Sequence, residues 1–264
     1  MKNLIALLML CVAFGASAFT TDTITVASNY LESPMKVTVI VPDQASAADP
    51  VPTVYLLNGY GGDYSSWGVV NKDLGNFADL YGMVMVMPSG RDSWYWDTDK
   101  MQMESFITKV LVPTIDKKYP TINKREKRAI TGLSMGGHGA FFLGARHPEL
   151  FGNLGSTSGG LNLLPFTNRW GISKLIGPYE GNEEKWKEHT AVTYIPQLKE
   201  GNYNIIFDCG VDDFFADINN DFHAQLLKAG VPHDYISRPG NHSRAYWENA
   251  IPYQLWFFNQ AFSK

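Results

Sequence analysis

A short run of small residues around one serine constrains this chain more than any other feature. Residues 131–140 contain the pattern Gly132-x-Ser134-x-Gly136. A serine at the tip of a tight turn between a strand and a helix has a strained backbone, and small residues two positions away let the strand and helix approach. The turn exposes the serine hydroxyl and places the Met135 N–H at a helix start, where it can stabilise an oxyanion. The pattern therefore predicts a strand–turn–helix unit with Ser134 as a nucleophile.

The residues on either side of this pattern distinguish that unit from a glycine-rich turn with an incidental serine. Residues 128–131, Arg-Ala-Ile-Thr, have the pattern of a short buried strand. Residues 136–146 have a small-residue face and are followed by Pro148, as expected for a closely packed helix that ends there. Both flanks favour the nucleophile turn.

The N-terminus has the pattern of a secretory signal peptide, residues 1–18. A lysine precedes an apolar stretch at residues 4–14, and Ala-Ser-Ala forms a small-residue cleavage site. We expect cleavage between Ala18 and Phe19 and export to the periplasm or the medium. No other apolar run approaches the ~20 residues that span a bilayer, so we expect no membrane partner after cleavage.

Length and charge limit the remaining possibilities. A chain of 264 residues can form one large α/β domain with a substantial core. The net charge of −4 gives no electrostatic reason to expect nucleic acid as a partner. The oligomeric state stays open.

The spacing of apolar residues predicts an alternation of strands and helices. Strands are expected at residues 23–26, 35–41, 53–57, 83–87, 128–131, 154–158, 204–209 and 234–237. Helices are expected at residues 71–81, 103–118, 136–146 and 214–229, and from residue 246 onward. This order is typical of an α/β fold with a mostly parallel sheet and helices on both faces. We expect one catalytic domain, residues 19–264.

Residues 161–201 interrupt this alternation. The segment is long and mixed in character, and it carries Trp170 and Trp186. A connection of this length inside a compact domain usually has a function or contains helices of its own. This insertion could therefore roof the site.

Ser134 needs a base to accept its proton, and His242 is the best candidate among the six histidines. It follows a predicted strand and the turn at residues 239–241, at the carboxyl edge of the sheet, where such folds place catalytic groups. The acid that orients it is expected between nucleophile and base in chain order. Asp212 and Asp213 both follow a strand at that edge, and the residues alone leave the choice open.

A glycine-rich segment at residues 58–62 also bears on the site. The glycines of residues 58–62 allow backbone N–H groups to face a ligand, so a second oxyanion donor is expected there. This segment lacks the Lys-Ser/Thr of a phosphate-binding loop, and no motif suggests a metal, so we expect neither cofactor nor metal.

With these features the chain resembles the putative esterase family of the α/β-hydrolase superfamily. That family includes esterase D (S-formylglutathione hydrolase), tributyrin esterase, feruloyl and acetyl-xylan esterases, siderophore esterases and mycolyltransferases. The likeness covers nearly the whole mature chain. It rests on the motifs at residues 54–59, 66–67, 128–137, 147–151, 158–159, 209–214 and 239–242, followed by Trp247.

This resemblance implies an α/β-hydrolase fold and assigns a role to each matching residue. Ser134 would be the nucleophile, His242 the base and Asp213 the acid. The backbone amides of Tyr60 and Met135 would form the oxyanion hole. Asn58 departs from the family pattern, since many relatives have His or Asp before the glycine, which leaves open which neighbour tunes the hole.

These observations favour an exported serine carboxylesterase that works through an acyl-enzyme. Export fits acetyl or feruloyl esters on plant polysaccharides better than the cytosolic esterase D reaction. The alternatives are an acyltransferase of the mycolyltransferase type and a non-catalytic carbohydrate- or ligand-binding protein on the same scaffold. Trp94, Tyr95 and Trp96 follow a strand at the carboxyl edge, so at least one of them is expected to bind substrate.

Overall fold

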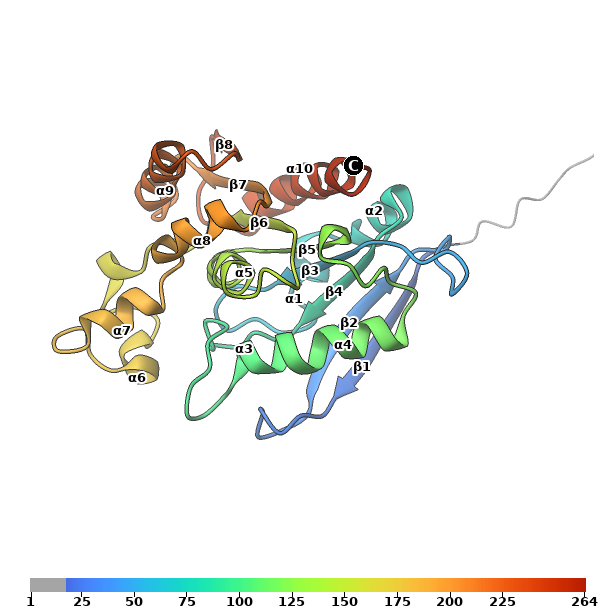
Figure 1. The fold of residues 1–264 in the computed structure, drawn as a ribbon, viewed down its shortest axis with the longest axis horizontal. Helices are drawn as coiled ribbons and strands as arrows, with labels where there is room; N and C mark the ends of the chain where they lie inside the picture. The colour runs from blue at the N-terminus through green and yellow to red at the C-terminus, as the bar shows by residue number, and fades with distance from the viewer. Residues whose placement is uncertain (1–17) are drawn as a thin grey trace, which may run out of the picture.

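The computed structural model of the chain describes residues 18–264, so all but the last residue of the predicted signal peptide lies outside the described residues. Eight strands form one sheet in the order β1-β2-β4-β3-β5-β6-β7-β8 (Figure 1). The strands are β1 (Thr20–Val26), β2 (Met35–Val41), β3 (Thr53–Leu57), β4 (Val84–Pro88), β5 (Arg128–Gly132), β6 (Asn153–Thr157), β7 (Asn204–Gly210) and β8 (Asp234–Arg238). Each lies where the sequence predicts a strand.

The sheet is mostly parallel, as predicted. Strand β2 runs antiparallel to its two neighbours, β1 and β4, and every pair from β4 to β8 is parallel. Strands β3 to β6 are buried along their whole length, as expected for parallel strands covered on both faces. The carboxyl ends of six parallel strands therefore meet at one edge of the sheet.

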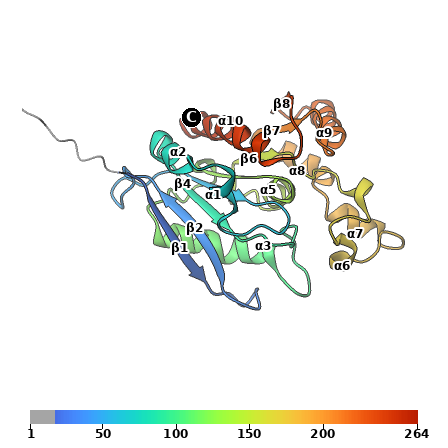
Figure 2. The same ribbon diagram turned by 180° about the vertical axis from the view of Figure 1, so that it is seen from behind.

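Helices cover both faces (Figures 1 and 2). One face packs against α1 (Ser66–Val70), α2 (Leu74–Tyr81) and α10 (Arg244–Phe262). The other packs against α3 (Met103–Phe106), the π-helical segment η1 (Ile107–Leu111), α4 (Val112–Lys118), α5 (Met135–Arg146) and α9 (Ala216–Ala229). Side chains alternate along β3. Tyr55 and Leu57 pack on the face that α5 covers, and Val54 and Leu56 pack on the face that α10 covers. Within residues 18–264, no helix combines the length and the apolar character needed to cross a membrane.

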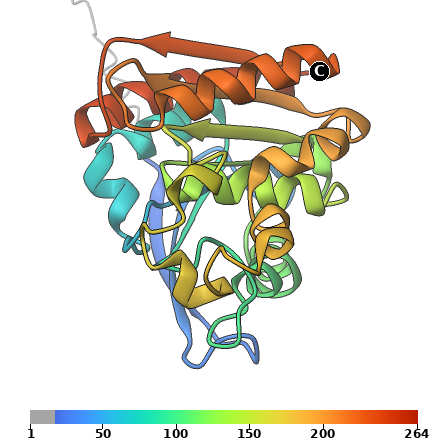
Figure 3. The ribbon, with the colours of Figure 1, turned by 90° about the vertical axis from the view of Figure 1, so that its left-hand side faces the viewer.

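The insertion at residues 161–201 contains short helices of its own, which is one of the two explanations that its length suggests. These are η3 (Leu164–Phe166), α6 (Ile172–Ile176), α7 (Glu183–Glu188), η4 (Ala191–Tyr194) and α8 (Ile195–Glu200). A further single turn, η2 (Arg125–Lys127), precedes β5. Helices α6 and α7 lie away from the sheet, and α8 connects them back to it (Figures 1 and 3).

The predicted helix at residues 71–81 is present but begins later, at Leu74, and a separate short helix, α1, precedes it. Asn71 is extended, with φ −138° and ψ 118°, and it ends α1. Its side-chain oxygen accepts a hydrogen bond of 2.8 Å from the N–H of Asp73, so a local turn competes with the helix at this point. Helix α2 then begins at Leu74.

Candidate active site

Ser134 lies at the tip of the turn between β5 and α5. Its backbone has φ +55° and ψ −117°, a left-handed conformation that is strained for any residue with a side chain. The flanking glycines allow the close packing around it. A β-carbon on Gly132 would lie 2.6 Å from the carbonyl oxygen of Leu57, and one on Gly136 would lie 2.6 Å from the carbonyl carbon of the same residue. The structure therefore contains the strand–turn–helix unit that the sequence predicts.

His242 and Asp213 come to Ser134 from the loops that follow β8 and β7. The Ser134 hydroxyl lies 2.9 Å from Nε2 of His242. Nδ1 of the same ring lies 3.0 and 2.9 Å from the two carboxylate oxygens of Asp213. Two backbone hydrogen bonds join the loops, from the Asp212 N–H to the Gly240 oxygen (2.9 Å) and from the Val211 N–H to the Arg238 oxygen (3.0 Å).

The two adjacent carboxylates have different positions. The side chain of Asp213 is fully buried, and it also accepts a hydrogen bond of 2.8 Å from the N–H of Phe215. Asp212 is exposed. A buried carboxylate that faces an imidazole can hold the ring in one orientation and stabilise its charged form. The geometry thus places Asp213, and not Asp212, where the acid is needed.

Aromatic rings surround the imidazole of His242. The Phe214 ring is 4.2 Å away between centroids, and the Trp247 ring meets the imidazole edge-on at 5.0 Å. Phe215 packs edge-on at 5.5 Å. The imidazole side chain is 15% exposed. These rings limit its contact with water, which strengthens its hydrogen bonds. Sequence reasoning did not select them as site residues, because aromatic residues in an apolar segment are more often core.

The backbone N–H groups of Tyr60 and Met135 are both available to a ligand in the Ser134 pocket. Among residues 18–264, neither the N–H of Tyr60 nor that of Met135 forms a hydrogen bond. Met135 is the first residue of the 12-residue helix α5, where the helix dipole favours negative charge. Tyr60 lies in a loop whose next two N–H groups are occupied, by Arg91 and by Gly59. The two donors that the resemblance selects are therefore both unoccupied among the described residues.

A cavity of about 460 Å³ opens above Ser134. It is lined by Ser134 and His242 and by the aromatic side chains of Tyr60, Trp170, Phe214 and Trp247, among others. Trp170 comes from the insertion, so the insertion contributes to the wall of this pocket. Trp186, the second tryptophan of the insertion, is buried and donates a hydrogen bond of 3.1 Å to the Gly177 oxygen.

The three aromatic residues predicted to bind substrate lie in the core. Trp94, Tyr95 and Trp96 are each no more than 1% exposed, and none lines the Ser134 pocket. Trp94 and Trp96 stack on each other and meet the ring of His138 edge-on at about 5.5 Å. Trp94 and Tyr95 have φ of +53° and +63°, so the chain curls back and turns these side chains inward. This placement corrects the expectation that one of them lines the site.

The other histidines lie elsewhere. His138, in the first turn of α5, is fully buried and donates from Nε2 to the carbonyl oxygen of His189 at 3.0 Å. Burial lowers the pKa of His138 to about 3, so its ring is neutral near neutral pH.

Among the described residues 18–264, no group of three or more His, Cys, Asp or Glu side chains could hold a metal ion.

A family model and two relatives in sequence indicate an esterase. A family model described as "Putative esterase" matches residues 28–258. An acetyl esterase from Caldicellulosiruptor saccharolyticus is 27% identical over 218 residues, which is 77% of this chain and 82% of the relative. An endo-1,4-beta-xylanase/feruloyl esterase from Xylanibacter ruminicola is 33% identical over 120 residues. That match covers 41% of this chain and only 16% of the larger protein.

Solved structures agree with the sequence matches. A ferulic acid esterase has a TM-score of 0.81 and 28% identity, and the superposition covers 93% of this chain and 99% of that chain. Together with the sheet order and the helices on both faces, this likeness shows an α/β-hydrolase fold, as the resemblance implied.

Proposed function

This chain belongs to the putative esterase family and is a carboxylic ester hydrolase, and we propose that it works through an acyl-enzyme on Ser134. The hydrogen-bonded chain from the Ser134 hydroxyl through His242 to Asp213 carries this proposal. In this arrangement a serine, an imidazole and a buried carboxylate have the geometry that nucleophilic catalysis requires.

The proposed reaction has two halves. The Ser134 oxygen attacks the ester carbonyl carbon while Nε2 of His242 takes the hydroxyl proton. The resulting oxyanion is held by the N–H groups of Tyr60 and Met135, each typically worth about a hundredfold or more in rate. The carbon–oxygen bond to the alcohol then breaks, and His242 returns the proton to the departing alcohol. Water repeats these steps on the acyl-enzyme and releases the acid.

We further propose that the protein is exported and acts on acetyl or feruloyl esters of plant polysaccharides. Three observations support this substrate class: an acetyl esterase relative, a relative that combines xylanase and feruloyl esterase in one chain, and a structural neighbour that is a ferulic acid esterase. The signal-peptide pattern at residues 1–18 supports export. Fractionation of cells that express the full chain tests export, which requires the mature protein to begin at Phe19.

The central experiment combines labelling with a substrate panel. A fluorophosphonate probe should label the mature protein and should fail to label Ser134→Ala, because the probe reacts with an activated serine. Acetyl, butyryl, feruloyl and longer acyl esters, tested separately, identify the acyl group. A Ser134→Ala or His242→Ala variant that hydrolyses esters at near-normal rates would contradict the assignment.

Acyl transfer is the alternative outcome of the same chemistry. An alcohol would replace water as the acceptor in the second half-reaction. Comparing the products with and without an added alcohol separates the two, since a transferase forms a new ester in preference to the free acid.

A further inference from the structure

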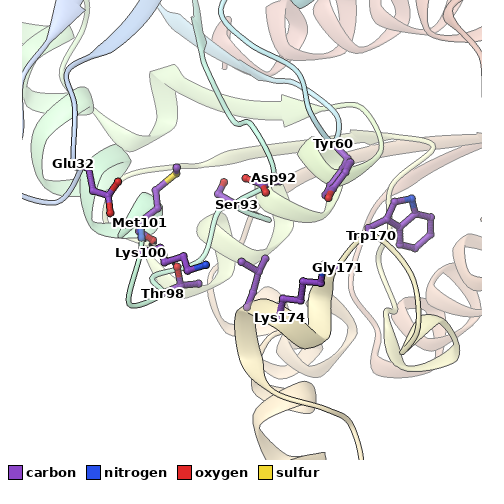
Figure 4. Close-up of a pocket in the computed structure, with 11 residues that line it drawn as sticks. Glu32, Tyr60, Asp92, Ser93, Thr98, Lys100, Met101, Trp170, Gly171 and Lys174 are labelled. Atoms are coloured by element: carbon purple, nitrogen blue, oxygen red, sulfur yellow. Dashed lines mark hydrogen bonds between the residues drawn. The ribbon is translucent and has the colours of Figure 1, made fainter.

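The polar side chains near Ser134 are of two kinds. Exposed side chains such as Asp92 and Lys174 line an open cavity beside the Ser134 pocket (Figure 4). A second group of polar side chains is buried between the sheet and α10. It is centred on Asp208 of β7, whose side chain is only 1% exposed. This buried group has no part in the reaction described above.

The carboxylate of Asp208 accepts a hydrogen bond at each oxygen. Thr157 of β6, which lies opposite Asp208 in the parallel register, donates its hydroxyl to Oδ1 at 2.7 Å. Gln254 of α10 donates from Nε2 to Oδ2 at 2.7 Å. Arg238, the last residue of β8, has Nη2 at 3.7 Å from Oδ1 and supplies the opposite charge. One carboxyl group thus contacts both neighbouring strands and the helix that packs on them.

Two of these contacts lead to the Ser134 turn. The carbonyl oxygen of Thr157 accepts a hydrogen bond of 3.0 Å from the N–H of Ser134. The side-chain oxygen of Gln254 accepts a hydrogen bond from the hydroxyl of Thr131, in the strand that ends at this turn. A β-carbon on Gly155 would lie 2.6 Å from that oxygen of Gln254, so a glycine is needed there to leave room.

The third contact leads to the loops of Asp213 and His242. The first loop follows β7, which contains Asp208, and the second follows β8, which ends at Arg238. The carbonyl oxygen of Arg238 accepts a hydrogen bond of 3.0 Å from the N–H of Val211, so the two loops leave the sheet together. The Asp208 carboxyl group therefore joins the segments that carry all three members of the hydrogen-bonded chain.

Stability alone gives no reason for a carboxylate at this position. A buried carboxylate loses its hydration, and its hydrogen bonds and ion pair only partly offset this loss. An apolar side chain of similar volume often stabilises a fold as well or better. What the carboxylate of Asp208 adds is a pair of acceptor atoms with fixed directions, one toward β6 and one toward α10.

We propose that Asp208 is a positioning residue, which holds the Ser134 turn in register with the loops of Asp213 and His242. The proposal rests on the proposed function and adds a residue that acts only through its hydrogen bonds. Without them β5 and β6 can shift against β7, and the 2.9 Å contact between Ser134 and His242 is lost from part of the molecules. Such a misplacement slows the reaction. Substrate binding is unaffected, because Asp208 does not line the Ser134 pocket.

Two substitutions remove these hydrogen bonds separately. Asp208→Asn puts an amide group, which cannot accept a hydrogen bond, in place of one oxygen. Thr157→Val keeps the shape of threonine and removes the hydroxyl donor. Each should lower kcat for a small ester about tenfold and leave KM unchanged. The rate is expressed per serine that a fluorophosphonate labels, so a loss of folded protein is not counted as a loss of kcat.

Two further variants separate positioning from packing. Thr157→Ser keeps the hydroxyl and should keep kcat close to that of the unmodified protein. Thr53→Val changes another fully buried threonine, in β3, whose hydroxyl has no hydrogen-bond partner among the described residues, and should also leave kcat unchanged. If Asp208→Asn does not fold, Thr157→Val decides. The proposal is overturned if the folded variants keep normal kcat, if the loss lies in KM, or if Thr157→Ser or Thr53→Val lowers kcat as much as Thr157→Val.

Amide hydrogen exchange tests the same contact without hydrolysis. The N–H of Ser134 is protected by its hydrogen bond to Thr157, and its exchange in heavy water is followed by nuclear magnetic resonance. Relative to the amides of β3, this exchange should be about tenfold faster in Asp208→Asn and Thr157→Val and unchanged in Thr53→Val. That result supports the role of Asp208 in fixing the turn even if no ester of the panel is cleaved and the proposed function fails. Normal exchange in both variants would overturn it.

Discussion

The hydroxyl of Tyr95 donates a hydrogen bond of 3.0 Å to the carbonyl oxygen of Asn58, the residue that begins the oxyanion loop. The side chain of Asn58 holds the same loop from its other side. Its oxygen accepts a hydrogen bond of 2.9 Å from the N–H of Gly90, and its amide donates to the oxygen of Gly59 at 3.0 Å. Asn58, the position that departs from the family pattern, thus fixes the segment that carries the Tyr60 N–H.

Tyr95→Phe should therefore slow catalysis without weakening substrate binding. The change removes one hydroxyl and leaves the buried Asn58 carbonyl without this partner, so the loop and the Tyr60 N–H can shift. We expect kcat to fall about tenfold and KM to stay the same for a small ester. Steady-state kinetics with thermal unfolding of the same samples checks this.

Tyr55→Phe is the matched control for this change. Tyr55 is also fully buried, and its hydroxyl has no hydrogen-bond partner among the described residues. Its removal should leave kcat unchanged. Equal losses of kcat in the two variants would show that Tyr95 acts only through general packing.

The adjacent carboxylates provide a second test. Asp213→Asn should lower kcat about 10⁴-fold, because an amide can hold the imidazole of His242 in the wrong tautomer and cannot stabilise its charge. Asp212→Asn should lower kcat less than about threefold, since that side chain is exposed and does not face the imidazole. Both variants are assayed on the same ester. The assignment of the acid is wrong if the larger loss belongs to Asp212.

The sheet and the Ser134 turn were predictable because each rests on a local pattern. Buried parallel strands are short, nearly continuous apolar runs, and the Gly-x-Ser-x-Gly pattern of the turn is itself a local signal, although the contacts that require Gly132 and Gly136 include Leu57 of β3. The position of His242 also followed from local signals, since the loop after a parallel strand must lie at one edge of the sheet. The helix break at Asn71 did not follow, because it depends on a single side-chain hydrogen bond to the N–H of Asp73.

The direction of the aromatic side chains could not be predicted. Trp94 and Tyr95 lie in the loop that follows β4 at the carboxyl edge of the sheet, and their sequence is equally compatible with side chains that point outward. Their left-handed backbone turns them into the core, and a tryptophan or a tyrosine gives no sequence signal for this conformation. Trp170, in the insertion, lines the pocket instead. Its contact with the site depends on long-range packing that a single sequence does not encode in any short segment.

A tryptophan of the core and a tryptophan of the pocket wall should respond differently to replacement by alanine. Trp96→Ala should lower the free energy of unfolding by about 3–5 kcal/mol, because its ring is fully buried. KM should then change equally for methyl and oligosaccharide esters. Trp170→Ala should raise KM for feruloyl esters more than for acetyl esters, with a smaller loss of stability, since its half-buried ring faces the pocket. A selective effect of Trp96→Ala on KM would restore the substrate-binding role expected for this segment.

The contact between α3 and α5 should make stability depend on pH. Glu104 lies in α3, and its carboxylate accepts hydrogen bonds from Arg146 (2.7 Å) and His147 (2.8 Å). Burial raises the pKa of Glu104, but the hydrogen bonds and charges of His147 and Arg146 outweigh it and lower the pKa below 4.5. A carboxyl group with a lowered pKa in the folded state stabilises the protein above its unfolded pKa, and this contribution is lost as the pH falls through the folded value.

Glu104→Gln should isolate this contribution. The amide has a similar shape but no charge, so at neutral pH the variant should be less stable by about 2 kcal/mol, the typical value of hydrogen bonds to a charged group. The difference between the two proteins should shrink as the pH falls below 4.5, because the carboxyl group of the unmodified protein then becomes neutral as well. Denaturant unfolding of both proteins at a series of pH values measures this difference. A gap that stays constant, or that widens toward acid, would show that the charge of Glu104 does not stabilise the contact between these helices.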